Sequence, residues 1–151
     1  MNIRFPKRSL SDQSMAAYER EGSMKNNKKK VLVIEDSRLV REAVRMVLEI
    51  NGFQVITAKD GEEGLATAAA EKPDEIVMDW NLPKLHGKAL VNQLQKGEST
   101  RGIPIIVVSA NSKAELGENY KTSNTKHHFR KDCNVLERLV QALQNQVPAL
   151  V

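Results

Sequence analysis

Three carboxylates, one hydroxyl and one amine stand directly after short segments that have the pattern of strands. Glu35 and Asp36 follow residues 31–34, and Asp79 follows residues 76–78. Ser109 follows residues 105–108, and Lys131 comes shortly after residues 126–129. If these segments lie parallel in one sheet, their carboxyl ends bring the five side chains to one edge. Carboxylates held that close repel one another unless a cation lies among them.

The chemistry that this set of groups indicates is phosphoryl transfer. Oxygen-only ligands favour a hard cation, and Mg²⁺ is the usual one where phosphate is involved. A hydroxyl and an ammonium are donors for phosphoryl oxygens, and positioning with charge neutralisation supplies most of the catalysis. The nucleophile would be a carboxylate, which forms an acyl phosphate.

Taken alone, each of these residues also has an ordinary structural interpretation. A Glu-Asp pair after a strand usually caps the next helix, and Asp36 could do so in addition to binding metal. Asp79 alone would be a turn residue, and Ser109 alone a satisfied core hydroxyl. Lys131 alone would be a solvated charge. Their joint occurrence at the ends of strands favours the functional interpretation.

Short apolar segments alternate with amphipathic segments from residue 31 onward. The expected strands cover residues 31–34, 53–58, 76–78, 105–108 and 126–129. The expected helices cover residues 39–48, 61–71, 88–95, 112–121 and 134–143. This alternation predicts an α/β fold, a doubly wound (βα)5 three-layer sandwich with a five-stranded parallel sheet. In such folds the functional crevice lies at the carboxyl ends of the strands.

Four blocks of the sequence together resemble response-regulator receiver domains, and chemotaxis-type single-domain receivers in particular. The blocks are KVLVIEDS at residues 30–37, IVMDWNLPKLHG at 76–87, IPIIVVSA at 103–110 and FRK at 129–131. The resemblance covers about residues 29–146. It implies a flavodoxin-like fold with strand order 2-1-3-4-5 and Mg²⁺ as the cofactor.

The resemblance also implies roles for single residues around the metal. Asp79 would be the phospho-acceptor, which takes its phosphoryl group from a kinase histidine. Asp36 would be a direct Mg²⁺ ligand, and Glu35 would hold the ion largely through water. Asn81 would offer its backbone carbonyl to the ion.

Further roles concern the phosphorylated state. Ser109 would hydrogen-bond the phosphoryl group, and Lys131 would pair with a phosphoryl oxygen on the opposite side. Asn81 and Asn111 occupy positions that resemble those tuning the rate of autodephosphorylation. His128 resembles the conformational switch residue, which is usually an aromatic. Because imidazole titrates near neutral pH, we hypothesise a pH-sensitive output.

Two features depart from the pattern of the family. Asp132 follows Lys131 where the family usually has proline, so the cis peptide of that loop is not expected. The expected helix from residue 112 is polar and contains Gly117, which makes that face of the domain less well defined.

The basic character of the chain lies in its N-terminal fifth. The whole chain has a formal charge of +4, and residues 1–30 hold eight Lys or Arg against three Asp or Glu. We therefore expect a flexible basic tail at residues 1–28, a receiver domain at 29–146 and a short tail at 147–151. No apolar run is long enough for a membrane span, and the lone Cys133 suits a reducing compartment.

The expected function is that of a phosphorylation-activated response regulator in a two-component pathway. The partners would be a histidine kinase or phosphotransfer protein and a downstream protein, with no membrane, in the cytoplasm. The chain would not be an enzyme, although it would assist its own phosphotransfer and dephosphorylation. A homodimer formed on phosphorylation is a further option. Because the chain ends soon after the last expected helix, we expect no DNA-binding output domain to follow.

Several alternatives remain open. The chain could be a receiver that belongs to a larger hybrid kinase or regulator. A nucleic-acid binder that acts through the basic tail is a less favoured alternative. A flavodoxin-like electron carrier needs a hydroxyl- and glycine-rich loop where residues 35–38 stand. An aspartate-based phosphatase needs a second aspartate where Asn81 stands.

Overall fold

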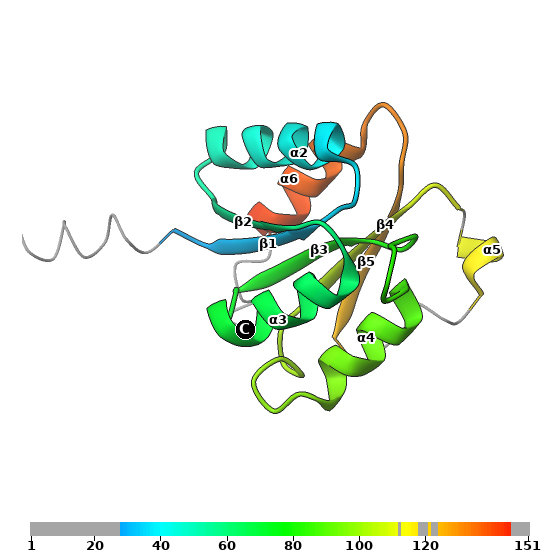
Figure 1. Ribbon diagram of the computed structural model, residues 1–151. Helices are drawn as coiled ribbons and strands as arrows, with labels where there is room; N and C mark the ends of the chain where they lie inside the picture. The colour runs from blue at the N-terminus through cyan, green and yellow to red at the C-terminus, as the bar shows by residue number, and fades with distance from the viewer. Residues whose placement is uncertain (1–27, 112, 118–120, 122–123, 146–151) are drawn as a thin grey trace, which may run out of the picture.

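A computed structural model describes residues 28–111, 113–117, 121 and 124–145, and shows one parallel sheet between layers of helices (Figure 1). The five strands have the order β2-β1-β3-β4-β5. The strands are β1 (Lys30–Ile34), β2 (Gln54–Ala58), β3 (Glu75–Asp79), β4 (Ile105–Ser109) and β5 (Thr125–Arg130). The helices are α2 (Arg38–Ile50), α3 (Gly61–Glu71), α4 (Gly87–Lys96), α5 (Lys113–Leu116) and α6 (Val135–Asn145). The predicted flavodoxin-like fold is confirmed.

Two apolar clusters hold the helices to opposite faces of the sheet. On one face, α2 and α6 pack through Val44, Leu48 and Leu139 against valines of the central strands. On the other face, α3 and α4 pack through Ala68 and Leu90 (Figure 1). Strands β3 and β4 are buried along their whole length, as continuous apolar runs in a parallel sheet require.

Strand register brings the carboxyl ends of the inner strands to one edge. Ile34 of β1 pairs with Met78 of β3, so Glu35 and Asp79 leave the sheet at the same level. Asp79 pairs with Val108 of β4, and Ser109 pairs with Arg130 of β5. Glu35, which follows β1, and Asp79 and Ser109, which end β3 and β4, therefore lie at this edge.

The ends of α2 show how the sequence sets the first crossover. The helix begins after Ser37, whose hydroxyl accepts a hydrogen bond from the backbone N–H of Val40 at 3.4 Å. The helix ends at Ile50, and Gly52 then adopts the left-handed conformation with φ of 91°. Glycine adopts that conformation without a steric penalty, as the sequence predicted.

The expected helix over residues 112–121 is the main difference from the prediction. Of the described residues in this range, Lys113–Leu116 are helical, and residues 112 and 118–120 lie outside the described residues. Gly117 follows with φ of 62°, a left-handed conformation that ends a helix. The segment is polar, so little apolar surface is available to hold a longer helix against the sheet.

Other boundaries differ little from those expected. β5 extends one residue beyond the prediction at each end, and α4 does the same. Residues 1–27 and 147–151 of the two predicted tails lie outside the described residues. Among the described residues there is no cis peptide bond, and no helix is long and apolar enough to cross a membrane.

Candidate functional site

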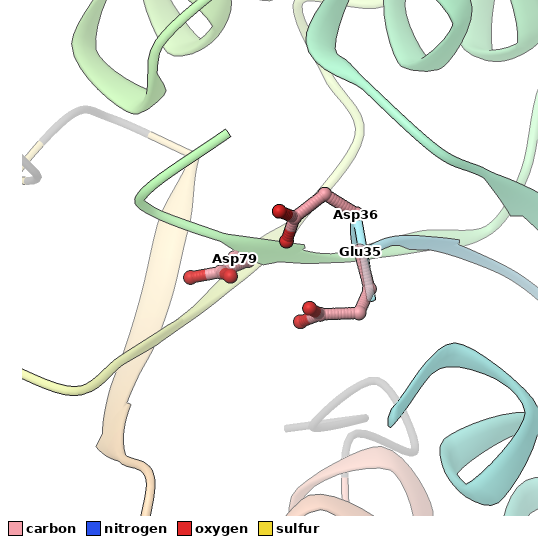
Figure 2. Close-up of side chains that lie close together, drawn as sticks. All are labelled: Glu35, Asp36 and Asp79. Carbon is pink, nitrogen blue, oxygen red and sulfur yellow. The ribbon is translucent and has the colours of Figure 1, made fainter. Parts of the chain in front are cut away.

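Three carboxylates converge at the carboxyl edge of the sheet. One side-chain oxygen from each of Glu35, Asp36 and Asp79 lies within 4.8 Å of the other two (Figure 2). Glu35 and Asp79 are buried at the ends of β1 and β3, whereas Asp36 is exposed. The structure thus brings together the acidic residues that the sequence predicted.

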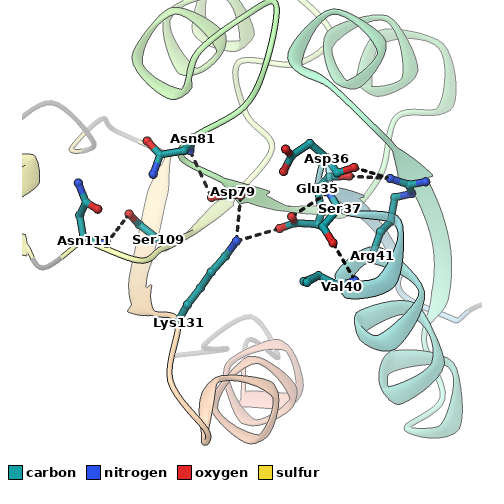
Figure 3. A network of polar contacts seen from close by, with 10 residues as sticks. All are labelled: Glu35, Asp36, Ser37, Val40, Arg41, Asp79, Asn81, Ser109, Asn111 and Lys131. Carbon is teal, nitrogen blue, oxygen red and sulfur yellow. Dashed lines mark hydrogen bonds and ion pairs between the residues drawn. The ribbon is translucent and has the colours of Figure 1, made fainter.

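Lys131 bridges the two buried carboxylates. Its Nζ lies 2.9 Å from Asp79 Oδ2 and 3.2 Å from Glu35 Oε2 (Figure 3). The residue follows β5, and its backbone N–H donates to the carbonyl of Ser109 at 2.8 Å. Burial alone would lower the pKa of Lys131, but its hydrogen bond to Asp79 and the charges of Asp79 and Glu35 outweigh burial and raise that pKa.

The pKa of Glu35 shows the effect of burial and of the neighbouring charges most clearly. Burial raises the pKa of its carboxyl to about 6, and the nearby charge of Asp79 acts in the same direction. Lys131 and the backbone N–H of Ser37, which lies 3.2 Å from Glu35 Oε1, partly oppose this shift. Glu35 therefore takes up a proton at a pH well above that of an exposed glutamate.

Asp79 is held in place by contacts on both carboxylate oxygens. Its Oδ2 pairs with Lys131, and its Oδ1 accepts a hydrogen bond from the backbone N–H of Asn81 at 3.2 Å. The second contact folds the chain after β3 back toward the carboxylate. It leaves Asn81 beside the acidic cluster, where the sequence analysis expected it (Figure 3).

Ser109 lies at the end of β4, on the other side of Asp79 from the acidic pair (Figure 3). The residue is buried, and its Oγ accepts a hydrogen bond from the backbone N–H of Asn111 at 3.0 Å. A hydroxyl that accepts one hydrogen bond keeps its own proton for donation to another group. Ser109 is therefore a donor available next to the carboxylate.

Two contacts near the junction of β1 and α2 were not predicted from the sequence. Ser37, rather than Asp36, caps α2. The Nη1 of Arg41 donates to the carbonyl oxygens of Glu35 at 2.9 Å and Asp36 at 3.4 Å. The available signal was a basic residue one turn into the helix that follows the acidic pair.

His128 lies within β5, in register with Val107 of β4, and the residue is 7% exposed. The imidazole is thus already buried in this structure. Its role as a switch remains a prediction, as does the influence of the Asn111 side chain on dephosphorylation.

The donor set fits a divalent cation. Three carboxylates and one ammonium give the cluster a net charge of −2 when all are ionised, and every candidate ligand atom is an oxygen. Oxygen ligands of this kind suit Mg²⁺, which also keeps several waters, and the exposed Asp36 leaves one side of the cluster open to them.

Comparison with known proteins agrees with this geometry. The family model described as "Response regulator receiver domain" matches residues 31–144. The phosphate regulon transcriptional regulatory protein PhoB of Escherichia coli is 36% identical over 87 residues, which are 58% of this chain and 38% of PhoB. The alkaline phosphatase synthesis transcriptional regulatory protein PhoP of Bacillus subtilis is 43% identical over 82 residues, 54% of this chain and 33% of PhoP. The chain spans about a third of the length of these relatives.

Solved structures show the same likeness over most of the domain. The chemotaxis response regulator CheY4 of Vibrio cholerae has a TM-score of 0.72 and 29% identity, covering 79% of this chain and 98% of that one. The receiver domain of the sensor histidine kinase PA1611 from Pseudomonas aeruginosa has a TM-score of 0.67 and 26% identity, covering 76% and 96%. That structure holds a magnesium ion in its active-site cleft.

Proposed function

Because the chain belongs to the family of response regulator receiver domains, signalling domains of two-component systems, we propose that phosphorylation of Asp79 switches it. The observation that carries this proposal is the contact of Lys131 with Asp79 within an acidic cluster. A carboxylate paired with a lysine and surrounded by further oxygen ligands is placed for attack on a phosphoryl group and for charge neutralisation.

The cluster would hold Mg²⁺ through Glu35, Asp36, Asp79 and the backbone carbonyl of Asn81. When bound, the ion neutralises negative charge on the carboxylates and on the phosphoryl oxygens. Asp36 would be a direct ligand, since its exposed carboxylate needs no displacement from a packed position. Glu35 already accepts hydrogen bonds from Lys131 and from the backbone of Ser37, which suits contact through water.

The transfer step uses groups of this chain in defined roles. A carboxylate oxygen of Asp79 attacks phosphorus, and the bond between phosphorus and the histidine nitrogen of the donor breaks. The electron pair of that bond stays on the imidazole, and the product is an acyl phosphate. Lys131 exchanges its contact with the carboxylate for one with a phosphoryl oxygen. The hydroxyl of Ser109 donates a hydrogen bond to another phosphoryl oxygen.

The proposed partners are a histidine kinase or phosphotransfer protein that supplies the phosphoryl group, and a downstream protein that binds the altered surface. We place the receiver unit at residues 29–146, between tails at 1–28 and 147–151, and the protein in the cytoplasm. A second candidate, a receiver within a larger regulator, is favoured by one observation. The relatives named as transcriptional regulators are about three times as long as the part that this chain matches.

Phosphorylation of the purified protein tests the proposal. Wild type, Asp79→Asn and Asp74→Asn are incubated with Mg²⁺ and acetyl phosphate, and intact mass is measured. Asp74 precedes β3 at the opposite end from Asp79 and therefore serves as a matched control. We expect a mass gain of one phosphoryl group in wild type and Asp74→Asn, but not in Asp79→Asn. Absence of the gain in wild type, or its persistence in Asp79→Asn, contradicts the proposal.

A further inference from the structure

Arg41 joins α2 to the backbone that carries the acidic pair. Its guanidinium donates to the carbonyl oxygen of Glu35 at 2.9 Å and to that of Asp36 at 3.4 Å (Figure 3). Arg41 is half-buried, and its backbone N–H donates to the carbonyl of Ser37 at 2.8 Å. One side chain thus spans two consecutive peptide groups of the metal-binding segment.

These two peptide groups determine where the acidic side chains point. The backbone N–H of Glu35 is held by the carbonyl of Ala58 at 3.0 Å, which fixes the segment from the β2 side. The carbonyls of Glu35 and Asp36 lie beyond the end of β1, and their partner is the guanidinium. Rotation of either peptide would swing the attached side chains away from Asp79.

Asp36 depends on this support most strongly. Glu35 is buried and its carboxylate is also held by Lys131, so packing and an ion pair orient it. Asp36 is exposed, so the packed core does not hold its side chain. The direction of its carboxylate follows from its backbone. Arg41 holds the carbonyl of Asp36, and the Glu35 carboxylate accepts from the N–H of Ser37 in the same peptide group.

We infer that Arg41 is a positioning residue, which sets the geometry of Glu35 and Asp36 for a divalent cation through their backbone carbonyls. The inference rests on the proposed function of the cluster. Partners that orient metal ligands without touching the metal typically contribute 10- to 100-fold in metal affinity. Both carbonyls accept from one guanidinium nitrogen, Nη1, which the planar group holds in a fixed direction. An ammonium carries its three donors on a flexible stem, so lysine should replace arginine only in part.

The same helix offers a matched control. Arg45 lies one turn after Arg41, where it pairs on the surface with Glu49 at 3.0 Å and Glu42 at 3.9 Å. Loss of Arg45 removes an equal charge and a similar side chain from α2 without affecting the acidic pair. A purely structural role of an arginine on this helix would therefore affect both variants alike.

The experiment measures Mg²⁺ affinity by calorimetry and by the fluorescence of Trp80, the single tryptophan of the chain, next to Asp79. The variants are Arg41→Ala, Arg41→Lys and Arg45→Ala, with thermal unfolding of each measured without Mg²⁺. We expect about 10-fold or greater weakening in Arg41→Ala, partial recovery in Arg41→Lys and less than 2-fold change in Arg45→Ala. If Arg41→Ala does not fold, the comparison of Arg41→Lys with wild type decides, with a weakening of about 3-fold or more expected.

Three outcomes overturn the inference, and they are distinguishable. Wild-type affinity in Arg41→Ala, or in Arg41→Lys where only that variant folds, overturns the positioning role and leaves the proposed function intact. Equal loss of Mg²⁺ affinity in Arg41→Ala and Arg45→Ala shows that the effect comes from α2 as a whole, and it also overturns the positioning role. A wild-type protein that shows no response to Mg²⁺ overturns the metal-binding part of the proposed function, and the positioning role with it.

Discussion

Lys131 and Asp79 are joined by a 2.9 Å contact although the strands that position them, β5 and β3, are not neighbours in the sheet. Asp79 ends β3, Lys131 follows β5, and β4 lies between these strands. The ammonium therefore reaches across the end of β4 to the acidic cluster. There it forms ion pairs with two buried carboxylates, those of Asp79 and Glu35.

Replacement of this lysine should make stability depend on metal. In Lys131→Met we expect the metal-free protein to lose about 2 kcal/mol of unfolding free energy, because two buried carboxylates lose their partner. The value lies below that of a fully buried pair because the lysine side chain is 30% exposed. Mg²⁺ should recover most of the loss. Urea unfolding with and without Mg²⁺ measures this, with the exposed Lys126→Met of β5 as control. If Lys131→Met and Lys126→Met lose equal unfolding free energy, the contacts of Lys131 with Asp79 and Glu35 do not stabilise the fold.

Mg²⁺ binding should depend on pH through Glu35. Its carboxyl pKa is raised to about 6, so protons compete with the ion below that pH, and affinity should fall by up to about tenfold per pH unit. The same shift lowers the stability of the metal-free fold as the pH rises from about 4.5 to 6, because the folded state holds the proton more tightly. Glu35→Gln should bind Mg²⁺ more weakly at pH 7.5. A plot of its Mg²⁺ affinity against pH should show no change of slope near pH 6. If the Mg²⁺ affinity of Glu35→Gln falls with pH as steeply as that of wild type, the titrating group is not Glu35.

Ser109 should matter after phosphorylation more than before it. Ser109→Ala leaves the backbone N–H of Asn111 without its hydroxyl partner, at a cost of about 1 kcal/mol. We expect Asp79 of this variant still to be modified by acetyl phosphate with Mg²⁺, whereas the accompanying change in Trp80 fluorescence is reduced by more than half. Ser109→Thr, which keeps the hydroxyl, should retain the change. A full fluorescence change in Ser109→Ala would show that the hydroxyl takes no part in the response.

Gly87 should resist substitution because the loop after Asp79 folds closely over it. An added Cβ would lie 2.5 Å from ring carbons of Trp80, and the N–H of Gly87 already donates to the Trp80 carbonyl at 3.0 Å. Gly87→Ala should cost about 1–3 kcal/mol and shift the tryptophan emission. Gly102→Ala is the control, since nothing lies within 4 Å of its added Cβ. Similar unfolding midpoints for the two variants would disprove the crowding at Gly87.

The fold and the acidic cluster were predictable from sequence because both depend on short-range patterns. Buried strands such as β4 are continuous apolar runs, and residues that directly follow parallel strands must meet at one edge. For that reason Asp79 and Lys131 could be placed at the same edge of the sheet although 52 residues separate them.

The remaining features depend on contacts that no local pattern encodes. Asp36 and Ser37 are both good capping residues, and only the path of the chain out of β1 decides that Ser37 caps α2. Arg41 binds backbone carbonyls, which every residue possesses, so a basic residue at this place in the helix does not by itself identify its partners.

The hydrogen bond from the Lys131 backbone to the Ser109 carbonyl has a mechanical consequence. This hydrogen bond fixes the main chain of Lys131 to β4, so we expect the main chain to stay in place when the side chain moves. Any change in what the ammonium contacts must come from rotation about the side-chain bonds of Lys131. The length of the Lys131 side chain therefore limits which atoms its ammonium can contact.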